Sequence, residues 1–193
     1  IHTERRALLA DLESLSDEQW GTASLCSQWT VKQAFGHVIA TAQMTPPKFF
    51  AGMIGSGFNF TGFIEKGASR FSAGSPSEML TAFRGMQQRT NHPPGPDDSW
   101  LGEAIVHAED IRRPLGIHRD YPVDAVTQVA DSYKGSNLVI GTKNRIAGVT
   151  LSATDTDWTH GSGPEVSGPM LALLMALTGR KAAHADLSGD GDE

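Results

Sequence analysis

The amino-acid sequence predicts an α+β protein in which an N-terminal four-helix bundle is followed by a small α/β domain. Up to about residue 120, apolar residues recur at helical spacing between recognisable helix start signals. After residue 120 the pattern of apolar residues changes: apolar and polar residues alternate at 149–154 with the period of a half-buried strand. We therefore expect two domains, residues 1–120 and residues 121–193.

Four helices are predicted in the first domain. Leucines at positions 8, 9, 12 and 15 form one helical stripe, and a capping box that opens at Thr30 starts a second helix, which ends near residue 45. Ser75 followed by Pro76 starts a third helix that runs to about residue 90. The fourth runs from residue 98 or 99 to about 115, with Gly116 after its end. Residues 49–71, rich in glycine and phenylalanine, indicate a broken helix or a loop that walls a pocket.

The second domain is predicted to begin with a helix at about 126–133 and to continue with short strands. The strand at 149–154 is followed by turn residues, a returning strand at 158–160 and another at 165–167. Pro169 then begins an apolar helix that ends before Gly179. Residues 188–193 are expected to form a solvated tail.

Composition and charge narrow the classes of partner. Sixteen basic and 22 acidic residues give a net charge of −6, and the cations are dispersed. We therefore expect no nucleic-acid or membrane partner, because phosphate binding needs a stripe of Lys and Arg. No run approaches the roughly 20 apolar residues of a membrane span, and no signal-peptide core is visible. The single cysteine excludes an intrachain disulfide, which suits a cytoplasmic location.

Three residues of the predicted bundle are candidate metal ligands. His37 lies up to two turns into the helix opened by Thr30, and Glu103 and His107 stand four apart, so they project from one face of the fourth helix. Two imidazoles and one carboxylate bind a divalent cation and leave a position open. The alternatives are a hydrogen-bonded histidine near a helix surface for His37 and a solvated helical pair for the other two.

Two neighbours of these residues carry alternative interpretations. Asp110 lies on the side of His107 and can fix the tautomer of its imidazole, or it can pair with Arg112 or Arg113. Cys26, near a helix N-terminus, is a candidate nucleophile, but lone cysteines are more often small buried hydrophobes and we do not assign it to the site. The remaining histidines, at positions 2, 92, 118, 160 and 184, are interpreted as surface residues.

Three blocks of sequence resemble the mycothiol-dependent maleylpyruvate isomerase family, part of the wider DinB-like helical bundles. The first runs from Leu25-Cys26-Ser27-Gln28-Trp29-Thr30-Val31 to His37, and the second, the most specific, from Glu103 to Gly116. The third spans 149–191 and includes ATDTDWTHGSGPEVSGP, LALLMALTGR and ADLSGDG.

The resemblance implies a four-helix, up-down-down-up bundle that binds a divalent ion, zinc in the best-known members. Carried over position by position, the ligands are His37, Glu103 and His107. Nickel or iron would also suit this donor set. The family's small domain is implied to help hold mycothiol through an arginine, for which Arg180 is the counterpart. The alternative for Arg180 is a cation that balances the dipole at a helix C-terminus.

The function implied is that of an actinobacterial, cytoplasmic enzyme that uses mycothiol. A metal-activated thiol would attack an electrophilic small molecule, as in a thiol S-transferase or an isomerase. The alternative is a non-catalytic bundle that binds a metal and a small ligand, because one fold hosts many functions. The sequence leaves the substrate open, as well as the choice between monomer and homodimer.

Overall fold

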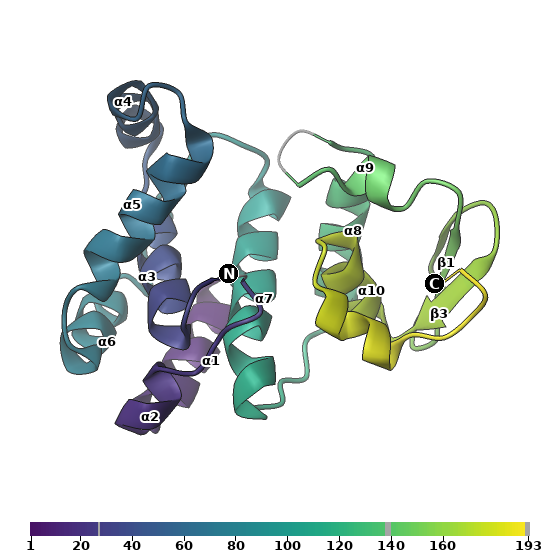
Figure 1. The fold of residues 1–193 in the computed structure, drawn as a ribbon, viewed down its shortest axis with the longest axis horizontal. Helices are drawn as coiled ribbons and strands as arrows, with labels where there is room; N and C mark the ends of the chain where they lie inside the picture. Colours follow the sequence, from purple (N-terminus) through teal and green to yellow (C-terminus); the bar gives the residue numbers. More distant parts are fainter. Residues whose placement is uncertain (27, 138–139, 192–193) are drawn as a thin grey trace. The chain divides into compact units, whose positions relative to one another are not determined.

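The protein is described here by a computed structural model that covers residues 1–26, 28–137 and 140–191 (Figure 1). It divides into two compact units, Ile1–His118 and Arg119–Glu193. Helices make up the first unit, and the second adds a small three-stranded sheet, so the predicted α+β class is confirmed. That residues 1–120 and 121–193 form two independently folding domains stays a prediction.

The first unit is built from helices of unequal length (Figure 1). Their bounds, in chain order, are α1 (His2–Glu13), α2 (Asp17–Trp20), α3 (Val31–Ala42), α4 (Pro46–Gly55), α5 (Phe60–Ser72), α6 (Pro76–Arg84), α7 (Asp97–Arg112) and the 3-10 turn η1 (Arg113–Leu115). Gly116 follows η1 with φ of 67°, a left-handed conformation that glycine adopts without strain.

The start of α3 is fixed by the capping box that the sequence predicts. The Gln33 backbone N–H donates to Thr30 Oγ1 at 3.3 Å, and the Thr30 N–H donates to Gln33 Oε1 at 2.9 Å. Two of the otherwise unpaired donors of the first turn are thereby satisfied. Because this end is fixed, the rotation of α3 is defined and His37 faces the interior of the bundle, where it is buried.

The segment between residues 49 and 71 is a broken helix rather than a pocket wall. Pro46 and Pro47 occupy the first positions of α4, and a short turn then leads into α5. The role of α5 was not predicted: this helix packs along α3 more extensively than any other helix does (Figure 1). The third predicted helix is α6, which ends at Arg84 rather than near residue 90.

The core of the first unit lies where α1, α3, α6 and α7 meet. Leu12 of α1, Phe35 of α3, Phe83 of α6 and Ile111 of α7 are almost completely buried in one cluster. The Phe35 and Phe83 rings meet edge to face, with their centroids 5.1 Å apart. Burying two such aromatic side chains contributes several kcal/mol, which holds α3 firmly against its neighbours.

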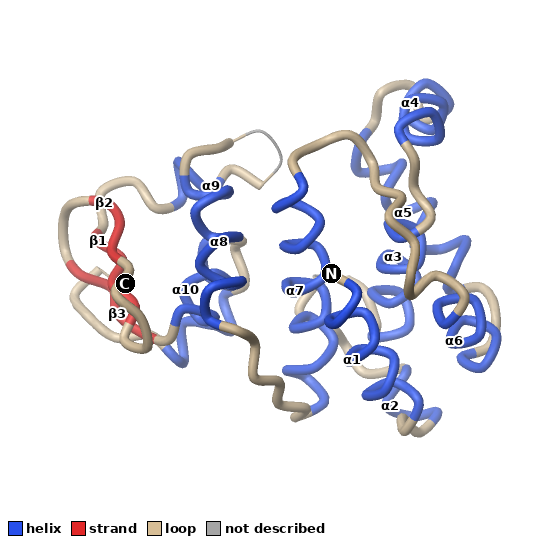
Figure 2. Tube along the Cα trace, turned by 180° about the vertical axis from the view of Figure 1, so that it is seen from behind, coloured by secondary structure: helices blue, strands red, loops and turns tan. Residues whose placement is uncertain are grey.

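The second unit combines a small sheet with short helices (Figure 2). Its elements are α8 (Val123–Lys134), α9 (Thr142–Arg145), β1 (Thr150–Ala153), β2 (Thr159–Gly161), β3 (Glu165–Gly168), α10 (Met170–Leu177) and the 3-10 segment η2 (Lys181–Asp186). The strand order is β2-β1-β3, with β1 antiparallel to β2 and parallel to β3. The three predicted strands are therefore present, whereas α9 and η2 were not predicted.

The predicted solvated tail at 188–193 is exposed at residues 188–190, as expected, but it is hydrogen-bonded along β3 and is not a free tail. Ser188 exchanges two backbone hydrogen bonds with Ser167 of β3, at 2.7 and 2.8 Å. The Gly191 N–H donates to the Glu165 carbonyl at 3.1 Å. The polar composition hid a segment that pairs along the edge of a strand, and residues 192–193 lie outside the described residues.

Gly36 allows α3 and α5 to approach closely, and its replacement by alanine should separate them. An added Cβ would lie 2.6 Å from the Ala68 carbonyl oxygen and 3.0 Å from Ser72 Cβ. The clash costs about 1–3 kcal/mol, and it outweighs the roughly 1 kcal/mol that alanine gains in helix propensity. We expect Gly36→Ala to lower the free energy of unfolding by about 1–2 kcal/mol in denaturant titrations.

Gly67 provides the matched control on the opposite helix of the same contact. Its added Cβ would lie 3.4 Å from Ala40 Cβ, an ordinary contact distance. Gly67→Ala should therefore leave stability unchanged or raise it slightly. Equal stability of the two variants would show that the α3–α5 contact is not tight at Gly36.

In the described parts of the chain, no helix is both long enough and apolar enough to traverse a bilayer.

Candidate metal centre and adjoining pocket

The structure brings the three predicted ligands together inside the first unit. His37 from α3 and the pair Glu103 and His107 from α7 offer ligand atoms that all lie within 4.8 Å of one another. The two imidazole rings stand edge to face with centroids 4.6 Å apart. The helical spacing of Glu103 and His107 places both on the side of α7 that meets α3.

The distances in this cluster fit a shared cation better than a hydrogen-bonded triad. Glu103 Oε2 lies 3.3 Å from His37 Nε2 and 3.4 Å from His107 Nε2. Hydrogen bonds between nitrogen and oxygen are usually about 2.9 Å long. Two ligand atoms that bind one tetrahedral zinc at about 2.0–2.1 Å stand roughly 3.3 Å apart. The donor set, two imidazoles and one carboxylate with a fourth direction open, therefore fits a divalent cation.

The opposite edge of the His107 ring is held by hydrogen bonds. Asp110 Oδ2 accepts from His107 Nδ1–H at 2.8 Å and from the Cys26 thiol at 2.9 Å. The Asp110 side chain is 0% exposed, so this carboxylate is fixed in place. Because Nδ1 carries the proton that Asp110 accepts, Nε2 is the nitrogen that faces Glu103 and is available to a cation.

Cys26 contacts the cluster, although the sequence did not lead us to assign this residue to the site. Its sulfur lies 3.6 Å from His107 Nδ1 in addition to its bond with Asp110. A second group of three potential ligand atoms is thus formed by Cys26, His107 and Asp110. The separations of 2.8 and 2.9 Å from Asp110 are hydrogen-bond lengths, so we interpret this second group as support for the His107 ring.

The three ligand side chains differ in their titration. Burial lowers the pKa of His37 below its ordinary value, although the hydrogen bond that His37 donates to Glu103 opposes the shift. Burial acts against the ionised forms of Glu103 and His107 as well. The mutual attraction of these two residues, together with the hydrogen bonds that involve His37, Asp110 and Cys26, outweighs the effect of burial on both pKa values. The pKa of Glu103 therefore lies well below and that of His107 well above the ordinary values.

These shifts give metal binding a defined pH dependence. At neutral pH without a cation, Glu103 is already ionised, His37 is neutral and His107 is protonated. A cation must therefore displace one proton from His107, so its affinity should rise about tenfold per pH unit until the pH exceeds the pKa of His107. Calorimetric titration of zinc in two buffers with different ionisation enthalpies should report about one proton released per cation. Zero protons released would contradict this assignment.

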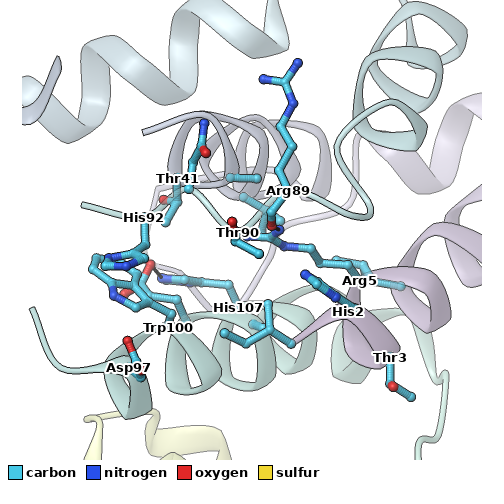
Figure 3. Close-up of a pocket in the computed structure, with 17 residues that line it drawn as sticks. His2, Thr3, Arg5, Thr41, Arg89, Thr90, His92, Asp97, Trp100 and His107 are labelled. Atoms are coloured by element: carbon cyan, nitrogen blue, oxygen red, sulfur yellow. Dashed lines mark hydrogen bonds and ion pairs between the residues drawn. The ribbon is translucent and has the colours of Figure 1, made fainter. Parts of the chain in front are cut away.

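A pocket of about 600 Å³ adjoins the cluster, a volume typical of small-molecule sites. Glu103 and His107 form part of its wall, and His2 and Arg5 enter it from α1 (Figure 3). His92, from the segment between α6 and α7, lies near Trp100 of α7, with ring centroids 5.6 Å apart. A cavity of small-molecule size therefore lies beside the candidate ligands Glu103 and His107.

Two histidines interpreted as surface residues prove to line this pocket. His2 projects into it from the first turn of α1, and the Nδ1 of His92 lies 2.7 Å from the Pro93 carbonyl oxygen (Figure 3). Neither belongs to the group of potential ligands around Glu103. Their sequence surroundings carry no local signal of this role, because the pocket is assembled from segments about 90 residues apart.

Arg180 lies in the second unit, directly after α10. Its Nη1 donates to the Thr178 carbonyl oxygen at 2.9 Å. Thr178 is the C-terminal cap of α10, so the contact matches the alternative interpretation of a cation at a helix C-terminus. A role of Arg180 in holding mycothiol stays a prediction.

Comparisons with known proteins agree with this architecture. Residues 1–93 match the family model described as the mycothiol maleylpyruvate isomerase N-terminal domain. No curated protein matches the sequence. A crystal structure of the mycothiol-dependent maleylpyruvate isomerase superposes with a TM-score of 0.63 at 12% identity, over 100% of this chain and 92% of that chain. A histidine-to-alanine mutant of such an isomerase gives 0.59 at 11% identity, with the same coverage.

At this level of identity the solved structures establish the fold, and the family model adds the relationship of the first half of the chain. Both findings agree with the family to which the three sequence blocks point. Residues 1–93 therefore match the mycothiol maleylpyruvate isomerase N-terminal domain, and the chain as a whole has the fold of mycothiol-dependent maleylpyruvate isomerase.

Proposed function

We propose that the protein is a divalent-metal-dependent enzyme that uses mycothiol to attack an electrophilic small molecule, as an isomerase or a thiol S-transferase. Zinc is the proposed cation, held by His37, Glu103 and His107. We propose that the enzyme acts in the cytoplasm on small molecules, without a nucleic-acid or membrane partner.

One observation carries the proposal: in a cluster of three ligand residues with metal-like spacing, two members, Glu103 and His107, form part of the wall of a small-molecule pocket. A structural cation would be enclosed by four protein ligands, whereas three ligands beside a cavity leave a position for a reactant. The names of the matching family and structures supply the thiol, because those proteins are described as mycothiol-dependent. The substrate named for those proteins, maleylpyruvate, is an electrophile of the proposed class.

The side chains of this protein have separate tasks in the proposed reaction. When bound, a divalent cation would lower the pKa of a thiol so that it reacts as a thiolate at neutral pH. His37 and His107 would hold the cation from two helices, and Glu103 would offset one of its two charges. Asp110 would keep Nδ1 of His107 protonated, so that Nε2 stays directed at the cation.

The two proposed outcomes share their first step. The thiolate sulfur forms a bond to an electrophilic carbon, and the electron pair of the adjoining double bond moves onto a carbonyl oxygen. In an isomerase, rotation about the resulting single bond and expulsion of the same thiolate regenerate the double bond with altered geometry. In an S-transferase the sulfur–carbon bond is kept. The neighbouring carbon then takes up a proton, or a leaving group departs from the attacked carbon with its electron pair. The pocket walls orient the electrophile and exclude water.

The experiment that tests the proposal measures product and thiol together. The purified protein, loaded with zinc, is incubated with mycothiol and either maleylpyruvate or a bimane electrophile. An isomerase converts maleylpyruvate while the thiol concentration stays constant, and an S-transferase consumes one thiol for each electrophile. Elemental analysis of the freshly purified protein identifies the resident cation and separates zinc from nickel and iron.

Absence of turnover with both electrophiles in a zinc-loaded protein would reject the proposal. Tight binding of a small ligand without turnover would instead favour the non-catalytic alternative, a bundle that binds a metal and a small molecule. A protein that holds no cation at all would reject both the enzyme and that alternative.

A further inference from the structure

Arg5 is a cation of the pocket wall that no carboxylate neutralises. It lies on α1 and is half-buried, and its Nη1 donates to the Arg89 carbonyl oxygen at 2.8 Å. Among the described residues no carboxylate oxygen lies within the 4.0 Å ion-pair distance of its guanidinium. Burial alone lowers the pKa of Arg5, which reflects a charge removed from water without a compensating anion.

The hydrogen bond to Arg89 leaves most of the guanidinium available. Arginine has five N–H donors in a planar fork, and this bond uses one of them. The bond also restricts the rotation of the side chain, so the remaining donors are held in position at the pocket. A fixed planar fork suits the two oxygens of a carboxylate, which it can bind in a bidentate manner.

The other charged groups of the wall do not take this role. Arg89 also lines the pocket, but its side chain extends away from His107, whereas Arg5 points into the cavity (Figure 3). Asp97 lies beside Trp100, on the opposite side of the pocket from Arg5 (Figure 3). The pocket thus has the candidate metal ligands Glu103 and His107 of α7 in its wall and an uncompensated guanidinium on α1.

We propose that Arg5 binds a carboxylate of the electrophile and so positions its reactive carbon toward the cluster of His37, Glu103 and His107. This inference rests on the proposed function, because it assumes that the electrophile occupies this pocket. Arg5 is then a specificity-determining residue: an electrophile with a carboxylate is favoured over a neutral one of the same shape.

The test compares two small probes that differ in charge. Maleate carries two carboxylates, and maleamide is its neutral analogue with the same carbon skeleton. Calorimetry or ligand-observed NMR measures the affinity of the purified protein for each probe. We expect the parent protein to prefer maleate, and we expect Arg5→Met to weaken maleate binding by at least about tenfold while changing maleamide binding less than about twofold.

Two further variants separate recognition from structure. Arg5→Lys keeps the charge without the planar fork and should restore part of the preference for maleate. Arg70→Met removes an exposed arginine of α5 that does not line the pocket, so its preference should equal that of the parent. A purely structural role of Arg5 would reduce binding of both probes equally.

Each outcome bears on the inference. A parent protein without preference for maleate, or an Arg5→Met variant that keeps the preference, would overturn it. The proposed function is judged separately, by metal content and thiol-dependent turnover. A protein that binds maleate through Arg5 but turns over no electrophile would keep the carboxylate subsite and reject the enzyme. An active enzyme without a preference for maleate would keep the proposed function and reject the carboxylate subsite.

Discussion

Replacing His37 or His107 with alanine should cost the protein its cation. The parent is expected to carry about one divalent ion per chain, and each variant should lose affinity by about a hundredfold or more. Changes to groups that only support a ligand cost 10- to 100-fold, and removal of a ligand exceeds that range. Thiol-dependent turnover should fall in the same proportion, because the remaining two side chains cannot hold the cation in the open geometry.

Elemental analysis after dialysis, together with competition against a chromogenic chelator, measures this loss. His92→Ala is the matched control, because it removes an imidazole from the same pocket wall that lies outside the group of potential ligands. It should keep the full metal content. If the His107→Ala protein retained one tightly bound cation, the assignment of this cluster as the metal centre would be wrong.

Asp110→Asn should weaken metal binding by about 10- to 100-fold while leaving all three ligands in place. The Asp110 carboxylate accepts from Nδ1 of His107 at 2.8 Å, and its negative charge increases the basicity of the ligating nitrogen. An amide of the same shape keeps an oxygen that can accept, but it has no charge. The affinity should therefore fall through a weaker ligand rather than through a missing one.

The same chelator competition measures this effect, and unfolding in denaturant shows whether the variant remains folded. Glu18→Gln, which removes one negative charge from an exposed position on α2, is the control for net charge. Its metal affinity should match that of the parent. An Asp110→Asn protein with unchanged affinity would show that the hydrogen bond to His107 does not tune the site.

The parts of the fold that depend on local sequence were predictable. The capping boxes at Thr30 and Ser75 place the starts of α3 and α6, since their signals lie within four residues. The alternation at 149–154 predicts β1 for the same reason. The α4–α5 region was not resolved in advance, because its glycines argued against a helix, although α5 does carry a one-sided apolar period and packs along α3.

The candidate site shows the same division. Glu103 and His107 share a helix, so their common face follows from a spacing of four. That His37 meets them depends on the packing of α3 against α7, which spacing alone does not dictate. The sequence marks His37 as a candidate ligand, and the family resemblance implies the same three residues. Arg5 and His92 reach the pocket from segments without a functional signature, and Cys26, although it lies in a block that resembles the family, gave no sign of its contact with His107.

The cluster draws its donors from α3 and α7, elements separated by more than 50 residues of intervening chain. An unfolded chain would have to close that long loop before the same three atoms could meet, so it competes poorly for the ion. Binding of the proposed ion would therefore be thermodynamically linked to helix docking: each added equivalent of free ion would favour the assembled bundle by mass action. In a cell, the supply of the ion would thus set the lifetime of the protein as well as its turnover.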